Sequence, residues 1–240
     1  MFNPFALPET WRFINYIQAF GELEVNGTNF GGMLFNSVWY TAISTALTVL
    51  MPCVPGYVLS KYRFKGRNFI YTVAITAMVV PIVGATASYM RLMATIGVLD
   101  TPLFTVIANL GGFGGAFLVY YGFFKSVSWA YAEAAQMDGG GPFTIFFRIM
   151  LPQAVPIMLT YAITNSINYW NTYESVLLYL PSYPTLAAGL FEYKSIAPRG
   201  AGGIPVYYAG LIIAMIPAII LFAVFSNRIM SSISIGGLKG

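Results

Sequence analysis

The sequence predicts an all-α, polytopic membrane protein with five transmembrane helices. Of its 240 residues, 58% are hydrophobic and 8% are charged, and the mean hydropathy is +0.70. Soluble domains carry about 25% charged residues, so this composition is typical of a membrane protein. Uncharged stretches that reach the roughly 20 residues needed to cross a bilayer are Gly31–Ser60, Asn68–Met90, Thr101–Phe124, Ile149–Tyr173 and Gly200–Asn227.

The segments outside these stretches differ in character. The residues before the first span contain prolines and charges instead of a basic start with an apolar core, so they do not resemble a cleaved signal peptide. We expect residues 1–30 to form an extracytoplasmic N-terminal segment and residues 31–228 to form the membrane domain. One shorter uncharged run, Ser175–Phe191, is interrupted by two prolines. We expect it to be an extramembrane or re-entrant loop and not a sixth span.

The distribution of Lys and Arg predicts the orientation, because short cytoplasmic loops are enriched in these residues. One side of the membrane carries Lys61, Arg63, Lys65, Arg67, Lys125, Arg148, Arg228 and Lys239. The other side carries Arg12, Arg91, Lys194 and Arg199. The richer side is predicted to be cytoplasmic, which places the N-terminus outside and the loop 125–152 and the tail 229–240 inside. The net charge of +4 follows from this asymmetry and gives no reason to expect a nucleic-acid partner.

The residue types argue against chemistry by this chain alone. The sequence has no histidine, and its one cysteine, Cys53, lies within a span. It contains no Gly-x-x-x-x-Gly-Lys-Ser/Thr phosphate loop, so we do not expect it to hydrolyse ATP or to be an enzyme. A secondary transporter or channel would need ionisable groups inside the membrane for ion coupling, and the five stretches contain none.

Several of the predicted spans contain prolines and glycines that can interrupt a helix. Pro52, Pro55 and Gly56 lie near the end of the first span, Pro81 and Gly84 in the second, and Pro217 in the fifth. Each proline removes a helix hydrogen bond and can kink its helix, although prolines are also simply tolerated in membrane helices. In the third span, small residues spaced four apart predict close packing of another helix; they are Gly111, Gly112, Gly115 and Ala116.

The segment between the third and fourth spans is the most informative. A short amphipathic helix of about three turns is predicted from Trp129, Ala130, Glu133, Ala134 and Met137. The following Asp138–Pro142 ends this helix, because Gly favours the left-handed C-cap and Pro cannot continue a helix. A second short helix, Phe143–Met150, leads to Pro152, which suits the first turn of the next span.

This segment predicts an element that transmits a rigid-body movement from a soluble partner to the membrane helices. Small Ala134 and Ala135 would allow it to enter a groove of the partner, and Glu133 offers a charge. The alternative is an ordinary solvated loop helix in which Glu133 and Asp138 serve only topology and capping.

The segment resembles the EAA loop of binding-protein-dependent ABC importer permeases. Matching positions at the family spacing are Glu133, Ala134, Ala135, Asp138, Gly139, Ile149, Leu151, Pro152 and Pro156. Two departures are Ser128, where the family often has Pro, and Gly140, where it often has Ala; both are mild changes that would loosen the loop. The resemblance implies an ABC importer permease fold that lacks the usual first span. It also implies a second homologous permease, two ATPase subunits that bind ATP and Mg²⁺, an external solute-binding protein, membrane lipid, and no cofactor on this chain.

Other stretches resemble the carbohydrate-importer branch of that family. They are Asn36–Ser37, Tyr62–Arg67, Trp170–Asn171 and the ending Gly237–Gly240. The resemblance implies transport of a sugar or sugar-derived solute. Permeases for amino acids, polyamines or metal chelates share the coupling motif and remain alternatives.

The fourth span carries a candidate solute route. Thr160, Thr164, Asn168 and Asn171 lie within about 80° of one another on a helical wheel. A polar stripe of this length faces protein or water rather than lipid. Hydroxyl and amide groups suit a sugar, as do the nearby rings of Tyr161 and Trp170. Hydrogen bonding between helices is the equal alternative.

Overall fold

The computed structural model of this chain describes residues 12–80, 84–197 and 203–236. Its helices are α1 (Ile14–Glu22), α2 (Phe30–Leu50), α3 (Cys53–Lys61), α4 (Arg67–Val79), α5 (Ala85–Thr95), α6 (Leu103–Asn109), α7 (Gly115–Ser126), α8 (Ala130–Met137), α9 (Pro142–Ile145), a π-helical turn (Phe146–Met150), α10 (Leu151–Asn171), α11 (Glu174–Tyr179), α12 (Leu186–Ile196) and α13 (Gly203–Gly236). Strands β1 (Glu24–Val25) and β2 (Thr28–Asn29) form a two-residue antiparallel hairpin. The predicted all-α class is confirmed.

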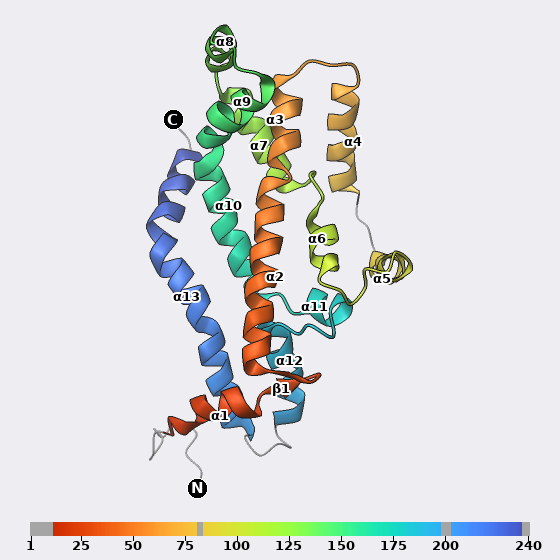
Figure 1. The fold of residues 1–240 in the computed structure, drawn as a ribbon, viewed down its shortest axis with the longest axis vertical. Coiled ribbons are helices and arrows are strands. Elements are labelled where there is room, and N and C mark those ends of the chain that lie inside the picture. Colours follow the sequence, from red (N-terminus) through yellow and green to blue (C-terminus); the bar gives the residue numbers. More distant parts are fainter. Residues whose placement is uncertain (1–11, 81–83, 198–202, 237–240) are drawn as a thin grey trace.

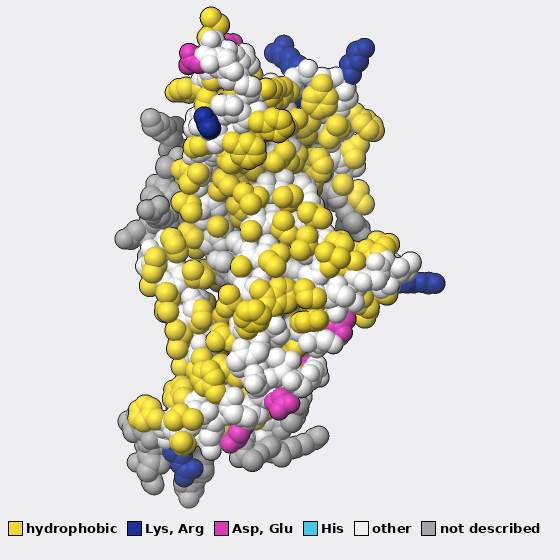
Figure 2. Space-filling view, viewed as in Figure 1, with side chains coloured by type: hydrophobic (Ala, Val, Ile, Leu, Met, Phe, Trp, Pro, Cys, Tyr) yellow, Lys and Arg dark blue, Asp and Glu magenta, His cyan; other side chains and the backbone are white. Residues whose placement is uncertain are grey.

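The molecule is elongated, and its long helices run nearly along its length (Figure 1). One extremity, here called the α8 end, carries α8, the connection between α3 and α4, and the end of α13. The opposite extremity, the α1 end, carries α1, the hairpin and α12. The described chain therefore starts and finishes at opposite ends. Figure 2 shows hydrophobic side chains over most of the visible face between the ends, with Lys and Arg side chains projecting at the α8 end.

Three helices in the described chain are long and apolar enough to cross a membrane. They are Phe30–Lys61, Pro142–Asn171 and Gly203–Phe225. They coincide with the first, fourth and fifth predicted spans. The first is interrupted between Leu50, where α2 ends, and Cys53, where α3 starts, and Pro52 lies at this interruption. By contrast, Pro217 lies inside α13 without ending it.

The second and third predicted spans are not continuous helices. The second divides into α4 and α5, and Gly84 precedes α5 in a left-handed conformation, with φ of 76°; Pro81 lies outside the described residues. The third divides into α6 and α7 around residues 110–114. An uncharged stretch has the length to cross a bilayer without forming one straight helix. The count of five spans stays a prediction.

Close helix packing occurs where α3 crosses α7. A Cβ added to Gly56 would lie 2.7 Å from Cβ of Tyr120, and one added to Gly112 would lie 3.3 Å from the carbonyl oxygen of Met51. The predicted packing role is therefore confirmed for Gly112. At Gly111 and Gly115 an added Cβ would meet nothing within 4 Å in this chain, so their packing role stays a prediction.

The run Ser175–Phe191 forms parts of two short helices, α11 and α12, so the prediction that it is not a span is confirmed. Two side chains of α2 form hydrogen bonds with the segment that connects α11 to α12. The amide of Asn36 donates to the carbonyl of Pro184 over 3.1 Å, and the hydroxyl of Ser37 accepts from the backbone N–H of Leu186 over 2.8 Å. The hydroxyl of Thr185 also caps α12. These bonds fix α12 at the α1 end of α2.

Candidate coupling surface and solute route

Helix α8 ends in a complete Schellman motif. The N–H of Gly140 donates to the carbonyl of Ala135 over 2.7 Å, and the N–H of Gly139 donates to the carbonyl of Gln136 over 3.0 Å. Gly139 has a φ of 80°, the left-handed conformation that this motif requires. Gly140 is also tightly placed, because an added Cβ would lie 2.7 Å from the Ala135 carbonyl oxygen. The predicted end of the helix at Asp138–Pro142 is confirmed, since α8 ends at Met137 with Asp138 as its C-cap. The predicted loosening by Gly140 is wrong, because this glycine makes the close approach that closes the motif.

The two faces of α8 differ sharply. Ala132 is fully buried and Ala135 is half-buried, whereas four of the six exposed residues of α8 form one stripe at helical spacing. We call this stripe the coupling surface: Ala130, Glu133, Ala134 and Met137. The side chain of Met137 is 89% exposed, which is unusual for a large apolar group and typical of an interaction site. Ala134 and Ala135, predicted to enter a partner together, thus face different surroundings.

Aromatic and apolar side chains brace the buried face of α8. Ala132 belongs to a cluster with Ile145, Met150 and residues of α3 and α7. The ring of Trp129 meets that of Tyr62 edge to face, with 5.9 Å between centroids, and Tyr62 in turn meets Tyr57 at 5.6 Å. The Lys61 ammonium donates to the carbonyl of Val127, just before α8. The helix is therefore held on α3 and α7.

A turn and a continuous helical segment connect α8 to α10. Helix α9, the π-helical turn and α10 form one continuous helical segment from Pro142 to Asn171. Pro152 occupies the first turn of α10, as predicted. Ile149 and Leu151 are half-buried, and Leu151 packs against the cluster beneath α8. Helix α8 is therefore connected to α10 through a packed core and a continuous helical segment.

Some exposed residues at this end were not predicted. Tyr131 is 58% exposed, Phe143 is 79% exposed and Phe147 is 57% exposed. Phe143 lies at the start of α9, beside the Gly-rich turn that follows α8. The sequence could have predicted this exposure, because these aromatic residues lie in a segment that was already expected to be outside the membrane. Their exposure enlarges the apolar area around the coupling surface.

The polar stripe of α10 is largely unburied in this chain. Thr164, Asn168 and Asn171 are exposed and Thr160 is half-buried. The Thr164 hydroxyl donates to the Thr160 carbonyl over 3.0 Å, and the Asn171 amide donates to the Ile167 carbonyl over 2.8 Å. These two donors are bonded within α10, and hydrogen bonding between helices remains the alternative to a solute route.

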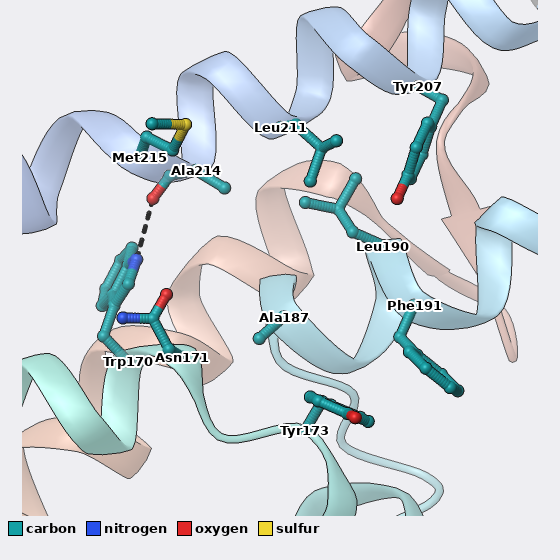
Figure 3. Close-up of a pocket in the computed structure, with 10 residues that line it drawn as sticks. All are labelled: Trp170, Asn171, Tyr173, Ala187, Leu190, Phe191, Tyr207, Leu211, Ala214 and Met215. Atoms are coloured by element: carbon teal, nitrogen blue, oxygen red, sulfur yellow. Dashed lines mark hydrogen bonds between the residues drawn. The ribbon is translucent and has the colours of Figure 1, made fainter.

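A hollow lies where the stripe meets the α1 end (Figure 3). It has a volume of about 250 Å³ and lies between α10, α12 and α13. It is lined by Trp170, Asn171, Tyr173, Ala187, Leu190, Phe191, Tyr207, Leu211, Ala214 and Met215. The Trp170 indole N–H donates to the Ala214 carbonyl over 2.9 Å, and the rings of Tyr173 and Phe191 stack 4.4 Å apart. Fixed aromatic faces beside an amide suit a sugar ring.

This architecture defines a membrane-embedded permease component. Residues 49–234 match the family described as binding-protein-dependent transport system inner membrane component, and the chain belongs to that family. Its relatives are transport permeases, in agreement with the predicted class of membrane transport protein.

Curated relatives extend this finding across nearly the whole chain. The diacetylchitobiose uptake system permease protein of Streptomyces coelicolor is 30% identical over 99% of this chain and 78% of its own length. The arabinooligosaccharides transport system permease protein of Bacillus subtilis is 29% identical over 97% of this chain and 81% of its own length. The trehalose transport system permease protein of Mycobacterium tuberculosis is 28% identical over 98% of this chain and 84% of its own length.

A solved structure shares the fold. It is a bacterial ABC transporter involved in the import of the acidic polysaccharide alginate, with a TM-score of 0.74 and 23% identity. The match covers 95% of this chain and 83% of that one. At this identity, the similarity establishes the fold alone.

Proposed function

We propose that this chain is a permease subunit of an ATP-driven ABC importer and forms half of a pathway for a sugar or sugar-derived solute. The names of its relatives support the solute class, since they refer to diacetylchitobiose, arabinooligosaccharides and trehalose. The observation that carries the proposal is the coupling surface, an exposed helix face braced on a core and continuous with a long membrane helix.

The coupling surface docks on an ATPase subunit. The transporter contains two ATPase subunits, which bind ATP and Mg²⁺, while this chain binds no cofactor. Met137 and Ala134 supply an apolar contact that excludes water, and Glu133 supplies a charge for a basic group of the ATPase. When the ATPases close, they shift α8, and the rod of α9 and α10 carries the shift into the membrane domain.

The other partners follow from the two ends of the molecule. The α8 end, with loop 125–152 and tail 229–240, is cytoplasmic, and the α1 end, with residues 1–30, is extracytoplasmic. A solute-binding protein docks at the α1 end, including residues 175–203, and a second homologous permease completes the pathway in the lipid bilayer. The Lys and Arg side chains at the α8 end support this orientation.

The solute route follows the exposed stripe of Thr160, Thr164, Asn168 and Asn171 on α10. The hollow beside Asn171 lies at the extracytoplasmic end of this route and offers aromatic faces together with amide groups. The second permease covers the stripe and supplies the facing wall. Uptake of labelled diacetylchitobiose, arabinooligosaccharides and trehalose by cells that express the complete transporter tests the solute class.

Two alternatives differ in what they require. A permease for a non-sugar solute shares the coupling surface and differs only in uptake preference. A secondary transporter or channel transports without an ATPase, so solute accumulation by this chain alone would favour it.

Co-purification tests the docking proposal directly. Glu133→Arg introduces a repulsive charge into the coupling surface, and we expect the tagged variant to lose the ATPase while still inserting in the membrane. Lys194→Glu reverses a charge at the α1 end and serves as the control. Unchanged ATPase recovery with Glu133→Arg would overturn the proposal.

A further inference from the structure

A basic hollow at the α8 end lies apart from the coupling surface. It opens at the connection between α3 and α4, has a volume of about 420 Å³, and is lined by Arg63, Phe64, Gly66, Arg67, Asn68 and Phe69. The connection carries four cations in seven residues, counting from Lys61 to Arg67, and the sequence has no Asp or Glu from Val25 to Leu99. The hollow is therefore lined by cations, and no carboxylate lies on its own elements.

Two of these cations are already engaged, and two are available. The Arg67 guanidinium donates to the Leu59 carbonyl over 2.7 Å and to the Tyr121 hydroxyl over 3.3 Å. Lys61 donates to the Val127 carbonyl. Arg63 and Lys65 are exposed, and Arg63 lines the hollow. The bonds of Arg67 hold one guanidinium at the wall of the hollow, while Arg63 is available for an anion.

An apolar stripe continues from this hollow along α4. Helix α4 packs on α3 and α7 through Ala74 and Tyr71. On the opposite side, Phe69 is 73% exposed and Val73 is 49% exposed, and they are one helical turn apart. Val80, at the end of α4, continues the same side and is 55% exposed. The hollow therefore offers cations at one point and an apolar face directly below it.

We infer that this hollow binds the headgroup of an anionic phospholipid of the cytoplasmic leaflet. The phosphate lies against Arg63 and Arg67, and the acyl chains lie along Phe69 and Val73. An anionic amphiphile matches both halves of the site, whereas a soluble anion uses only the cations. Juxtamembrane clusters of Lys and Arg attract anionic lipids with about a fivefold preference for each cation. The inference rests on the cytoplasmic placement of the α8 end in the proposed function.

Fluorescence quenching by brominated lipids tests this site. Phe69→Trp places a reporter on the stripe, and the signal is the difference between this variant and the parent chain, which has four tryptophans. The complete transporter is reconstituted in phosphatidylcholine vesicles that contain brominated phosphatidylglycerol or brominated phosphatidylcholine. We expect stronger quenching by phosphatidylglycerol, and a preference that falls about fivefold when Arg63→Gln is added. Arg91→Gln, an exposed arginine on α5, is the matched control and leaves the preference unchanged.

Three outcomes would overturn the inference. Equal quenching by the two lipids means that the hollow has no headgroup preference. A preference that survives the double variant Arg63→Gln/Lys65→Gln means that other cations produce it. Loss of ATPase from the transporter with Arg63→Gln, without a change in lipid preference, means that the hollow contacts protein instead. If the transporter shows no lipid preference but still takes up solute with ATP, the lipid inference fails while the proposed function stands. The experiment therefore distinguishes failure of the lipid inference from failure of the proposed function.

Discussion

The carbonyl of Ala135 accepts a hydrogen bond of 2.7 Å from the backbone N–H of Gly140. This bond reverses the chain after α8 and sets the direction in which α9 leaves it. Together with the left-handed Gly139, it joins α8 to the continuous helical segment from Pro142 to Asn171 through a hydrogen-bonded turn. If α8 transmits movement to α10, as proposed, the geometry of this turn should matter for transport.

The first prediction concerns that turn. Gly139→Ala introduces a Cβ at a φ of 80°, which costs about 1–2 kcal/mol. We expect a lower apparent melting temperature of the purified chain and weaker ATP-driven uptake. Gly122→Ala adds the same methyl group inside α7, where nothing lies within 4 Å, and should be neutral or stabilising. Equal behaviour of the two variants would contradict the role assigned to the turn.

The second prediction concerns the bond between Ser37 and Leu186. Ser37→Ala leaves the N–H of a buried residue without its acceptor, which costs about 1–3 kcal/mol. Hydrogen–deuterium exchange at residues 186–190 should therefore accelerate. Ser166→Ala is the matched control, because the Ser166 hydroxyl donates only to the Ile163 carbonyl of its own helix. Unchanged exchange in Ser37→Ala would show that this bond does not hold α12.

The third prediction concerns a polar network between α2, α6 and α10. The Tyr169 hydroxyl donates to the Asn109 side-chain oxygen over 2.8 Å, and the Asn109 amide donates to the Ser44 hydroxyl over 3.3 Å. A double-mutant cycle of Tyr169→Phe and Asn109→Ala should give a coupling free energy of unfolding of about 0.6 kcal/mol, and not above about 1.7 kcal/mol. Strictly additive effects would mean that the two side chains do not stabilise each other.

The fourth prediction concerns the solute route. Asn168→Leu removes an exposed amide from the stripe of α10. If the stripe lines the pathway, this change should lower uptake or alter the preference among the sugars tested, at normal protein levels. Unchanged uptake together with unchanged preference would remove Asn168 from the route.

Much of the fold was predictable because its signals are local. The first, fourth and fifth spans follow from uncharged stretches that form long helices, and the stop after Met137 follows from the glycines at 139 and 140. Pro152 was correctly placed in the first turn of α10. Proline has no backbone N–H, and the first turn of a helix is where that N–H would have no helical partner anyway.

The features that were missed depend on partners distant in sequence. The division of the third span into α6 and α7 does not follow from its lack of charge. Close packing was predicted for Gly112, but its partner Met51 was not. Ala135 turns toward the core because the cluster of α3 and α7 residues lies beneath it. Asn36 and Ser37 contributed to a family resemblance, but their role requires knowing that residues 184–186 lie beside them.

The most direct test of the account is solute accumulation in proteoliposomes. Vesicles that contain the complete transporter and the solute-binding protein should accumulate the transported sugar only when ATP is supplied on the ATPase side. Vesicles that contain this chain alone should accumulate none, and Glu133→Arg should abolish accumulation by the complete transporter. Accumulation by the chain alone, or wild-type accumulation with Glu133→Arg, would contradict the claim that α8 transmits force from an ATPase.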